Sequence, residues 1–388
     1  MKKVFLIAIA SLTACIFAKA QNDLDDQNTL NPLVSGVPSL MIAPDARAGG
    51  MGDVGAATLP SVAAQHWNPS KYVFMESQAG LQFSYTPWLS RLVDDINLFY
   101  LVGYWKPDDL QAFSASLRYF SLGDVMLTDP FGGEIFPARP NEFAVDVAYS
   151  RKLSEVFSAS ALFRFIYSDL TNGTKYSPNL DPMYPGVAFA ADISAYYRQP
   201  IQALADEAYF SVGINLSNLG SKISHTKGET SIFIPANLRL GVSFDYPLDS
   251  YNRISISGDV NKIMVPTRRK KDGELLTEAE YSDMSSLKGI FTSFSDSPLG
   301  GKGELQEIMW SVGLEYSYNK QFFIRTGYFN EHQNVGNRKY FTAGAGFNLN
   351  FIHIDAGYVI ATQPTNPLDQ TLKLSLGFDW DGIRELLR

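Results

Sequence analysis

Between residue 78 and residue 380, runs of alternating apolar and polar side chains make up most of the chain. The last run is the clearest, because every second residue from Leu372 to Trp380 is large and apolar while Lys373 and Asp379 lie in the intervening positions. A period of two is typical of a β-strand whose two faces meet different environments. The runs have roughly the nine to eleven residues that a tilted strand needs to cross a bilayer, whereas strands of soluble proteins average about five to six. The pattern predicts a transmembrane antiparallel β-barrel, with a soluble sandwich or propeller as the alternative.

About fourteen such runs can be counted, and an even number is typical of bacterial barrels. They lie near residues 78–88, 97–105, 111–120, 142–152, 156–167, 187–198, 207–217, 236–247, 252–263, 306–318, 320–329, 339–349, 351–361 and 370–380. After the first strand, long connections (121–141, 168–186, 218–235 and 264–305) alternate with short ones (106–110, 153–155, 247–251, Asn319 and Asn350). Short periplasmic turns and long outer loops explain this alternation, which predicts that both termini lie in the periplasm.

The two faces of the predicted strands differ in charge and in aromatic content. By parity, the face that carries charges of both signs points into the lumen, with Arg118, Asp146, Arg164, Asp192, Arg239, Asp245, Asp259, Glu315, Arg325, Asp355 and Lys373. Mixed charge indicates paired networks and a plugged barrel. Aromatic residues gather at strand ends, where interfacial girdles form: Tyr85, Trp88, Tyr104, Trp105, Tyr167, Tyr196, Tyr197, Tyr316, Tyr318 and Trp380.

Residues 1–20 have the lysine-rich start, short apolar run and small-residue end of a secretory signal peptide. No later segment has the roughly 20 consecutive apolar residues of a membrane helix. A lipoprotein cleavage site before Cys15 is an alternative, although the following Ile16 and Phe17 are apolar where a polar tether is usual. Cys15 is the only cysteine, so disulfides cannot hold the mature fold.

Neither charge nor motif predicts a nucleic-acid ligand or a catalytic centre. The net charge is −8, whereas nucleic-acid binding needs a basic surface. The four histidines (His66, His225, His332 and His353) have no metal-binding spacing, and no G-x-S-x-G motif is present. We therefore expect no enzyme activity, no catalytic or metal-binding residues and no cofactor.

Residues 21–75 lack strand periodicity, and we expect them to form a small hatch in or beneath the barrel of residues 76–388. The segment from Gly50 to Gly55 fits the dinucleotide pattern G-x-G-x-x-G. That fingerprint needs a preceding strand, a following helix and a later acidic residue in a βαβ unit, whereas this chain soon reaches Pro60. A compact glycine turn is the better interpretation.

The same segment resembles the start of the FadL-type barrels. The resemblance is carried by the run Pro44-Asp45-Ala46-Arg47-Ala48-Gly49-Gly50-Met51-Gly52, by Gly55-Ala56-Ala57 and by Trp67-Asn68-Pro69-Ser70. Asn68 and Pro69 match the Asn-Pro-Ala motif of the FadL luminal hatch, and Ser70 replaces its alanine. The wider sequence of this segment is similar to that of the PorV family of the type IX secretion system. PorV-family proteins lie in the outer membranes of Gram-negative Bacteroidota and also have fourteen strands.

The resemblance implies a protein that receives secreted cargo. PorV-like proteins bind the C-terminal signal domain of cargo at a giant translocon barrel (Sov/SprA-like) and deliver it to an attachment complex with the sortase-like PorU. No catalytic residues come with that role. A FadL-like transporter of hydrophobic small molecules is the alternative, disfavoured by the luminal charges. A lipid A or lipid deacylase is a third, disfavoured by the missing catalytic motifs.

The long connection 264–305 has its own pattern. Thr277 and Glu280 form a capping-box motif, and an apolar helical stripe follows with Met284, Leu287, Phe291 and Phe294. We expect either a helix that folds over the barrel mouth or a docking surface for a partner barrel or cargo. The basic block Arg268, Arg269, Lys270 and Lys271 would then contact outer-membrane lipid and lipopolysaccharide phosphates.

Overall fold

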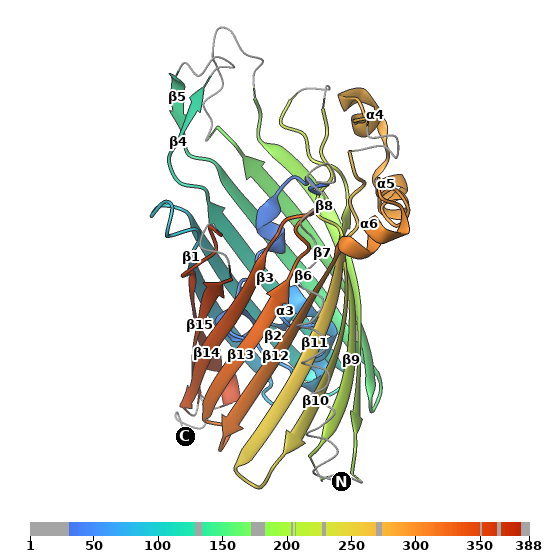
Figure 1. Ribbon diagram of the computed structural model, residues 1–388. Coiled ribbons are helices and arrows are strands. Elements are labelled where there is room, and N and C mark those ends of the chain that lie inside the picture. Colours follow the sequence, from blue (N-terminus) through green and yellow to red (C-terminus); the bar gives the residue numbers. More distant parts are fainter. Residues whose placement is uncertain are drawn as a thin grey trace.

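The computed structural model describes residues 31–128, 134–171, 183–202, 205, 207–226, 230–268, 274–349, 351–362 and 366–381. The predicted signal peptide, with Cys15, and the basic residues Arg269, Lys270 and Lys271 lie outside these ranges. Within them the chain forms a closed antiparallel barrel with a short-helix segment inside (Figure 1). None of the helices in the described ranges is long and apolar enough to cross a bilayer.

The barrel has the predicted fourteen strands, and neighbouring strands in the chain are neighbours in the sheet. They are β1 (Ala79–Pro87), β2 (Asn97–Asp108), β3 (Gln111–Ser121), β6 (Asn141–Ser154), β7 (Phe157–Asp169), β8 (Gly186–Pro200), β9 (Tyr209–Gly220), β10 (Asn237–Pro247), β11 (Asn252–Ile263), β12 (Ile308–Tyr318), β13 (Phe322–Asn330), β14 (Lys339–Leu349), β15 (Ile352–Ala361) and β16 (Leu372–Asp379). A separate hairpin of β4 (Val125–Thr128) and β5 (Glu134–Ala138) lies in the connection between β3 and β6. Pairing of β1 with β16, with Gly80 opposite Asp379, closes the ring.

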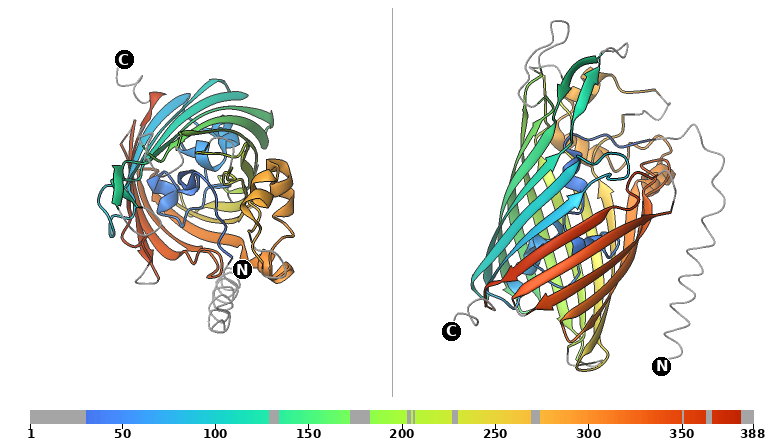
Figure 2. Two further views of the ribbon diagram at one scale, coloured as in Figure 1. Left: turned by 90° about the horizontal axis from the view of Figure 1, so that it is seen from above. Right: turned by 90° about the vertical axis from the view of Figure 1, so that its left-hand side faces the viewer.

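Seven short helices complete the described fold. The N-terminal segment contains η1 (Pro38–Met41), α2 (Ala46–Gly49), α3 (Ala64–Trp67) and η2 (Pro69–Phe74). The connection between β11 and β12 contains α4 (Glu278–Asp283), α5 (Ser286–Thr292) and α6 (Gly301–Gln306). The first group lies inside the ring and the second at its periphery (Figure 2).

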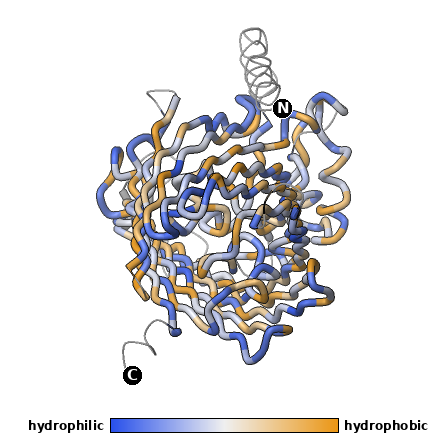
Figure 3. Tube along the Cα trace, turned by 90° about the horizontal axis from the view of Figure 1, so that it is seen from below, coloured by the Kyte–Doolittle hydropathy of each residue, from blue (hydrophilic) through white to orange (hydrophobic). Residues whose placement is uncertain are grey.

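Side chains alternate between the lumen and the outside as the sequence predicts. In β3, for example, Ser114 and Arg118 are buried, while the intervening Phe113 and Leu117 are exposed. Seen from below, hydrophobic and hydrophilic positions alternate along the strands of the wall (Figure 3). The predicted luminal charges all follow this parity, and all except the half-buried Asp355 are buried.

Aromatic residues form girdles near both ends of the outer wall, as expected. Contacting rings at the short-turn end belong to Trp105, Phe113 and Tyr149. Two of the predicted girdle residues, Tyr104 and Tyr196, are instead buried on the luminal side, where they contact rings of the N-terminal segment. Each is one residue away from an outward aromatic, and the alternation of the strand turns it inward.

The described chain begins and ends at opposite ends of the barrel. The first residue of β1 and the last of β16 lie at the short-turn end, as expected for an even strand number. Asn31, however, lies at the long-loop end, where its backbone N–H donates to Asn334 O (2.7 Å) and its side chain to Glu307 (3.2 Å). Asn31 and the end of β16 are thus at opposite mouths, because the N-terminal segment runs along the bore. The two chain ends themselves lie outside the described residues, so the prediction that both are periplasmic stays a prediction.

The outward parity makes a quantitative prediction at Val242, which lies midway along β10 and is 50% exposed on the outer wall. Val242→Arg should lower the free energy of unfolding by about 2–4 kcal/mol, the cost of a cation facing the bilayer midplane. Urea unfolding in lipid vesicles measures this cost. The conservative Val242→Leu should stay within about 1.5 kcal/mol of the parent, and an equal loss in both variants would contradict an outward Val242.

Candidate functional site

Residues 31–75, called the hatch below, cross the lumen and are held by their own caps. Asp45 caps α2 by accepting a hydrogen bond from Ala48 N at 2.9 Å, and its other oxygen accepts one from Trp67 Nε1 at 2.6 Å. Asn68 caps η2, with Pro69 at the first helical position, where its missing N–H costs nothing. The residues that carry the family resemblance are thus the junctions between the short helices.

Asn68, Pro69 and Ser70 fasten the hatch to the wall. Asn68 Nδ2 donates to Ala56 O within the hatch (3.0 Å) and to Ala195 O of β8 (2.9 Å), and Asn68 Oδ1 accepts from the Ser70 backbone (3.2 Å) and from its hydroxyl. The serine that replaces the family's alanine therefore adds a hydroxyl contact inside the motif.

Two wall serines complete the fastening of this motif. Ser150 of β6 donates to Pro69 O at 2.8 Å, and Ser158 of β7 donates to Ser70 O at 2.7 Å. A buried backbone carbonyl needs a hydrogen-bond partner, and the wall hydroxyls supply it here. The motif is a structural joint between the hatch and three strands.

From β9 round to β15, luminal glycines let the hatch backbone lie against the wall. They form three cross-strand pairs: Gly213 with Gly241, Gly313 with Gly327 and Gly344 with Gly357. A Cβ on Gly327 would lie 2.1 Å from the carbonyl carbon of Met51, and one on Gly213 would lie 2.0 Å from Ala56 O. Glycine within a strand marks a place where another backbone approaches closely.

The hatch side of this contact is the segment that fits G-x-G-x-x-G. Gly52 has φ +71° and lies against the backbone of Tyr328, a position that no other residue fits without strain. The next residues, Gly55 and Ala56, donate their N–H groups to Asp259 of β11 at 2.8 and 3.0 Å. The prediction of a compact glycine turn is confirmed.

Charged pairs link the hatch to the wall and the wall strands to each other. Glu315 of β12 pairs with Arg47 of α2 at 2.9 Å and with Arg325 of β13 at 2.6 Å, and Arg325 continues to Asp355 at 2.5 Å. Similar pairs join Arg164 to Asp146 and Asp192, Arg239 to Asp259, and Lys373 to Asp53 of the hatch. The paired luminal networks expected from mixed charge are therefore present.

Two basic groups of the hatch are buried without a carboxylate partner at hydrogen-bond distance. Lys71 Nζ donates to Gly55 O at 2.6 Å and to Thr58 Oγ1 at 3.1 Å, and burial, together with the nearby Arg47, lowers the pKa of Lys71 to about 7. Burial and the adjacent Arg118 hold the pKa of His66 well below its usual value. A neutral His66 can accept the hydrogen bond from Arg118 at its Nδ1, 2.9 Å away.

Below the hatch, toward the short turns, the lumen opens into a cavity of about 330 Å³. Its lining includes the ion chain of Arg47, Glu315, Arg325 and Asp355 as well as His353. Charges of both signs line it, so this space suits water and polar groups better than an apolar solute.

The loop helices differ in part from the expected single stripe. The capping box of Thr277 and Glu280 is present at the start of α4. The helix then ends at Met284, and Ser285 caps a second helix, α5. Met284 packs inward against the cluster of Phe233, Val265 and Tyr281, so it does not belong to an exposed surface. Leu287, Phe291 and Phe294 are exposed.

The surroundings of these helices also differ from expectation. They lie beside the barrel mouth and not across it (Figure 2). Arg268, the one residue of the basic block within the described ranges, already pairs with Glu278 at 2.7 Å and stacks over Tyr281. A role for Arg268 in binding lipopolysaccharide phosphate would have to compete with these contacts.

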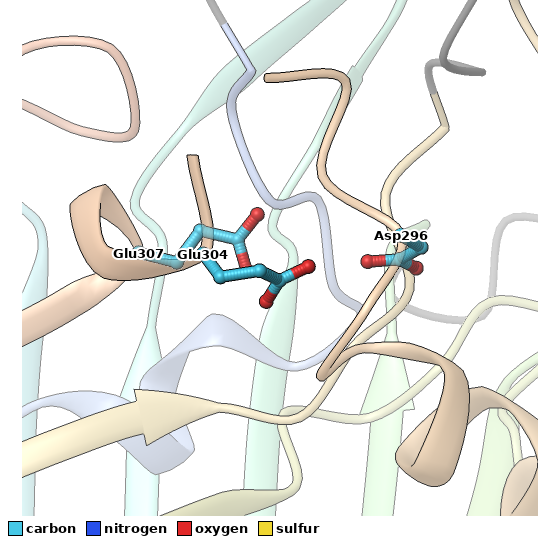
Figure 4. Close-up of side chains that lie close together, drawn as sticks. All are labelled: Asp296, Glu304 and Glu307. Atoms are coloured by element: carbon cyan, nitrogen blue, oxygen red, sulfur yellow. The ribbon is translucent and has the colours of Figure 1, made fainter. Parts of the chain in front are cut away.

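Sequence inspection missed an acidic group at the base of these helices. Asp296, Glu304 and Glu307 turn toward one another (Figure 4), close enough to resemble a metal site. Lys262 of β11 already pairs with Glu304 at 2.9 Å and with Glu307 at 2.6 Å, and Asp296 accepts from Thr267 N at 3.0 Å. Burial and the two glutamates raise the pKa of Asp296 to about 7. We interpret the group as the attachment of α6 to β11.

The four histidines lie in separate parts of the structure. His66 is in the hatch, His353 bonds to Asp379 near the end of β16, His225 contacts Ser168, and His332 lies in the connection from β13 to β14.

Comparison with known proteins identifies a related family by sequence. Residues 24–270 match the family model described as Type IX secretion system protein PorV. Comparison with curated proteins gives no match.

Solved structures share the fold at low sequence identity. A TodX deletion mutant described as a monoaromatic hydrocarbon channel is 12% identical over 87% of this chain and 99% of its own, with a TM-score of 0.52. The toluene transporter TodX of P. putida is 11% identical over 87% and 98%, with a TM-score of 0.51. A FadL homologue of Pseudomonas aeruginosa is 11% identical over 90% and 100%, with a TM-score of 0.46. The two TodX structures, with TM-scores above 0.5, confirm the barrel fold predicted from the sequence.

The close approach at Gly327 predicts that a single methyl group there loosens the hatch. Gly327→Ala places a Cβ 2.1 Å from Met51, so the hatch must shift; overpacking of this kind costs about 1–3 kcal/mol. We expect higher ion conductance than the parent in planar lipid bilayers. In the control Gly258→Ala, the new Cβ meets its nearest atom, Ser311 O, at 3.5 Å, and conductance should not change. Equal conductance in all three proteins would argue against a hatch that blocks the flow of ions through the lumen.

The lowered pKa of Lys71 predicts a pH dependence of stability. From about pH 7 to about pH 10 the unfolded lysine holds a proton that the folded one has lost, so the free energy of unfolding should rise with pH by up to about 1.4 kcal/mol per unit. Below about pH 7 both states are protonated and this contribution no longer changes. Urea unfolding in detergent at several pH values measures the slope. Lys71→Met should remove it; identical slopes in both proteins would disprove the assignment.

Proposed function

The chain belongs to the PorV family of type IX secretion system proteins, and from that premise we propose that this outer-membrane barrel binds the C-terminal signal domain of secreted cargo at a giant translocon barrel. It then delivers the cargo to a surface attachment complex with a sortase-like protease. The observation that carries the proposal on the structural side is the hatch fastened across the lumen. A barrel whose lumen is occupied by a fastened hatch offers its ends and outer surface to partners, not its interior.

The contacts around the hatch support a role for the ends and outer surface of the barrel instead of its interior. Hydrogen bonds and ion pairs reach it from β3, β6, β7, β8, β10, β11, β12, β14 and β16. Each pairs a buried polar group of the hatch with one of the wall, and breaking such a pair leaves an unsatisfied group in the lumen. Passage of a solute along the bore would require many of them to break together.

We assign the long loops to the cell surface and the short turns to the periplasm, as in bacterial barrels generally. The assignment puts the end of β16 in the periplasm and Asn31 at the cell-surface mouth. Cargo and attachment complex would then approach the same end as the long connections, including that between β11 and β12.

Two other functions fit the sequence less well. The TodX structures are described as a hydrocarbon channel and a toluene transporter, but an apolar solute would meet charged residues such as Arg47, Glu315 and Arg325 in the cavity described above. A lipid deacylase needs a serine and a histidine in contact; His225 approaches Ser168 at 3.1 Å, at the loop end of β7. We propose no catalytic role for this pair.

A pull-down from native outer membranes tests the proposal. The protein, tagged at its C-terminal end, should co-purify with secreted proteins that carry C-terminal signal domains and with a very large barrel protein. Cargo from which the signal domain has been deleted should be absent from the sample, because that domain is the proposed contact.

An unrelated outer-membrane barrel with the same tag serves as the control and should retain neither cargo nor translocon. Uptake of toluene by cells that produce the protein distinguishes the transporter. Uptake above that of cells without the protein, in the absence of any cargo in the pull-down, would overturn the proposal.

A further inference from the structure

One lysine of the barrel wall has the outward parity of a lipid-facing residue and is nevertheless buried. Lys262 shares the outward parity of β11 with Ile256 and Val260, which are 45% and 44% exposed. A cation at an outward position is expected to reach water, yet Lys262 is only 8% exposed. Something covers the outside of the barrel at this point.

The cover is the connection between β11 and β12. Glu304 and Glu307, at the end of α6, pair with the Lys262 ammonium, and the ring of Phe294 lies 5.6 Å from it. The helices therefore fold outward and back onto the lipid-facing side of the wall. In the ribbon views, α5 and α6 project from the side of the barrel near its long-loop end (Figures 1 and 2).

Aromatic rings give the depth of this site. Val260 lies opposite Trp310 of β12, and Trp310 continues a row of outward rings through Tyr328 and Phe341, with centroids 5.5 and 4.8 Å apart. Such a row marks the boundary between hydrocarbon and headgroups. Lys262 is two residues above Val260, which is about 7 Å along the strand. The helices around it are therefore level with the headgroups.

The exposed side chains of these helices suit that level. Leu287, Phe291 and Leu305 are 69%, 74% and 70% exposed, and Phe294 is 46% exposed. Lys288 and Lys302 beside them are exposed as well. Three further acidic residues, Glu278, Glu280 and Asp283, are on α4, which lies toward the loop end from α5 and α6 (Figure 1). The large exposed side chains of α5 and α6 are therefore apolar or basic, and the one carboxylate of these two helices, Glu304, is paired with Lys262.

We propose that α5 and α6 form an interfacial seat that rests in the outer leaflet beside β11 and β12. Leu287, Phe291 and Leu305 enter among the acyl chains and headgroups, and Lys288 and Lys302 face lipid phosphates. The seat takes the place of the partner-docking role expected for this loop from the sequence. It depends on the barrel lying in a membrane and not on the secretion role, so either can fail without the other.

Single cysteines report the surroundings of the seat directly. Phe291→Cys and Leu305→Cys, each carrying a nitroxide spin label, are placed in vesicles of phosphatidylethanolamine and phosphatidylglycerol. Accessibility of the label to oxygen, which concentrates in lipid, is compared with accessibility to a water-soluble nickel chelate. We expect the oxygen-to-nickel ratio at both sites to be close to that of the wall position Val260→Cys.

The matched control is Leu275→Cys, because Leu275 is 66% exposed in the same connection but precedes α4; its ratio should favour the nickel chelate. The parent protein, whose only cysteine is Cys15, is labelled in parallel as the background. Heat-modifiable mobility on gels verifies that each variant keeps its barrel. Nickel accessibility at Phe291 and Leu305 equal to that at Leu275 would overturn the seat in favour of a water-exposed surface. Protection from both probes would overturn it in favour of a protein contact.

Discussion

A strand inside a bilayer has no water to satisfy its backbone, and every N–H and C=O of the wall must find a partner in another strand. The pairing of β1 with β16 meets this requirement by removing both edges of the sheet. Closure at fourteen strands then creates a second problem, because a ring of this size is wider than its own side chains can fill. The hatch solves it, and most of the polar chemistry of the protein lies at the surface between hatch and wall.

That surface is built from three kinds of residue with three tasks. Glycines such as Gly213 and Gly327 give room for the backbone of the hatch. Serines such as Ser150 satisfy its carbonyls, and charged residues such as Glu315 hold its side chains. A buried ion pair adds little net stability, because desolvation offsets the attraction, but removing one partner is costly. The pairs therefore specify one position for the hatch more than they stabilise it.

The strands were predictable from the sequence because lipid and lumen impose a period of two over many residues. The luminal charges were predictable by the same parity. The hatch contacts were not, because helices of four to six residues have no periodicity to detect and their partners are more than a hundred residues away, as for Asn68 and Ala195. The second cap at Ser285 divides a stripe that spacing alone makes continuous. By its parity Lys262 is an ordinary outward residue. Its burial could not be predicted, because Glu304 and Glu307 are more than forty residues away in the chain and cover it only in the folded structure.

The path of the hatch through the barrel bears on how the molecule is assembled. Asn31 lies at one mouth, and the end of the hatch joins β1 at the other. The segment therefore passes through the closed ring of strands from one mouth to the other. It is made before any strand, whereas the seam between β1 and β16 cannot form until the last strand exists. The strands must consequently close around the hatch segment, which has to be inside the ring before β1 pairs with β16. Contacts such as that between Ala46 N and Ser375 Oγ, 329 residues apart in the chain, can form only as the seam shuts.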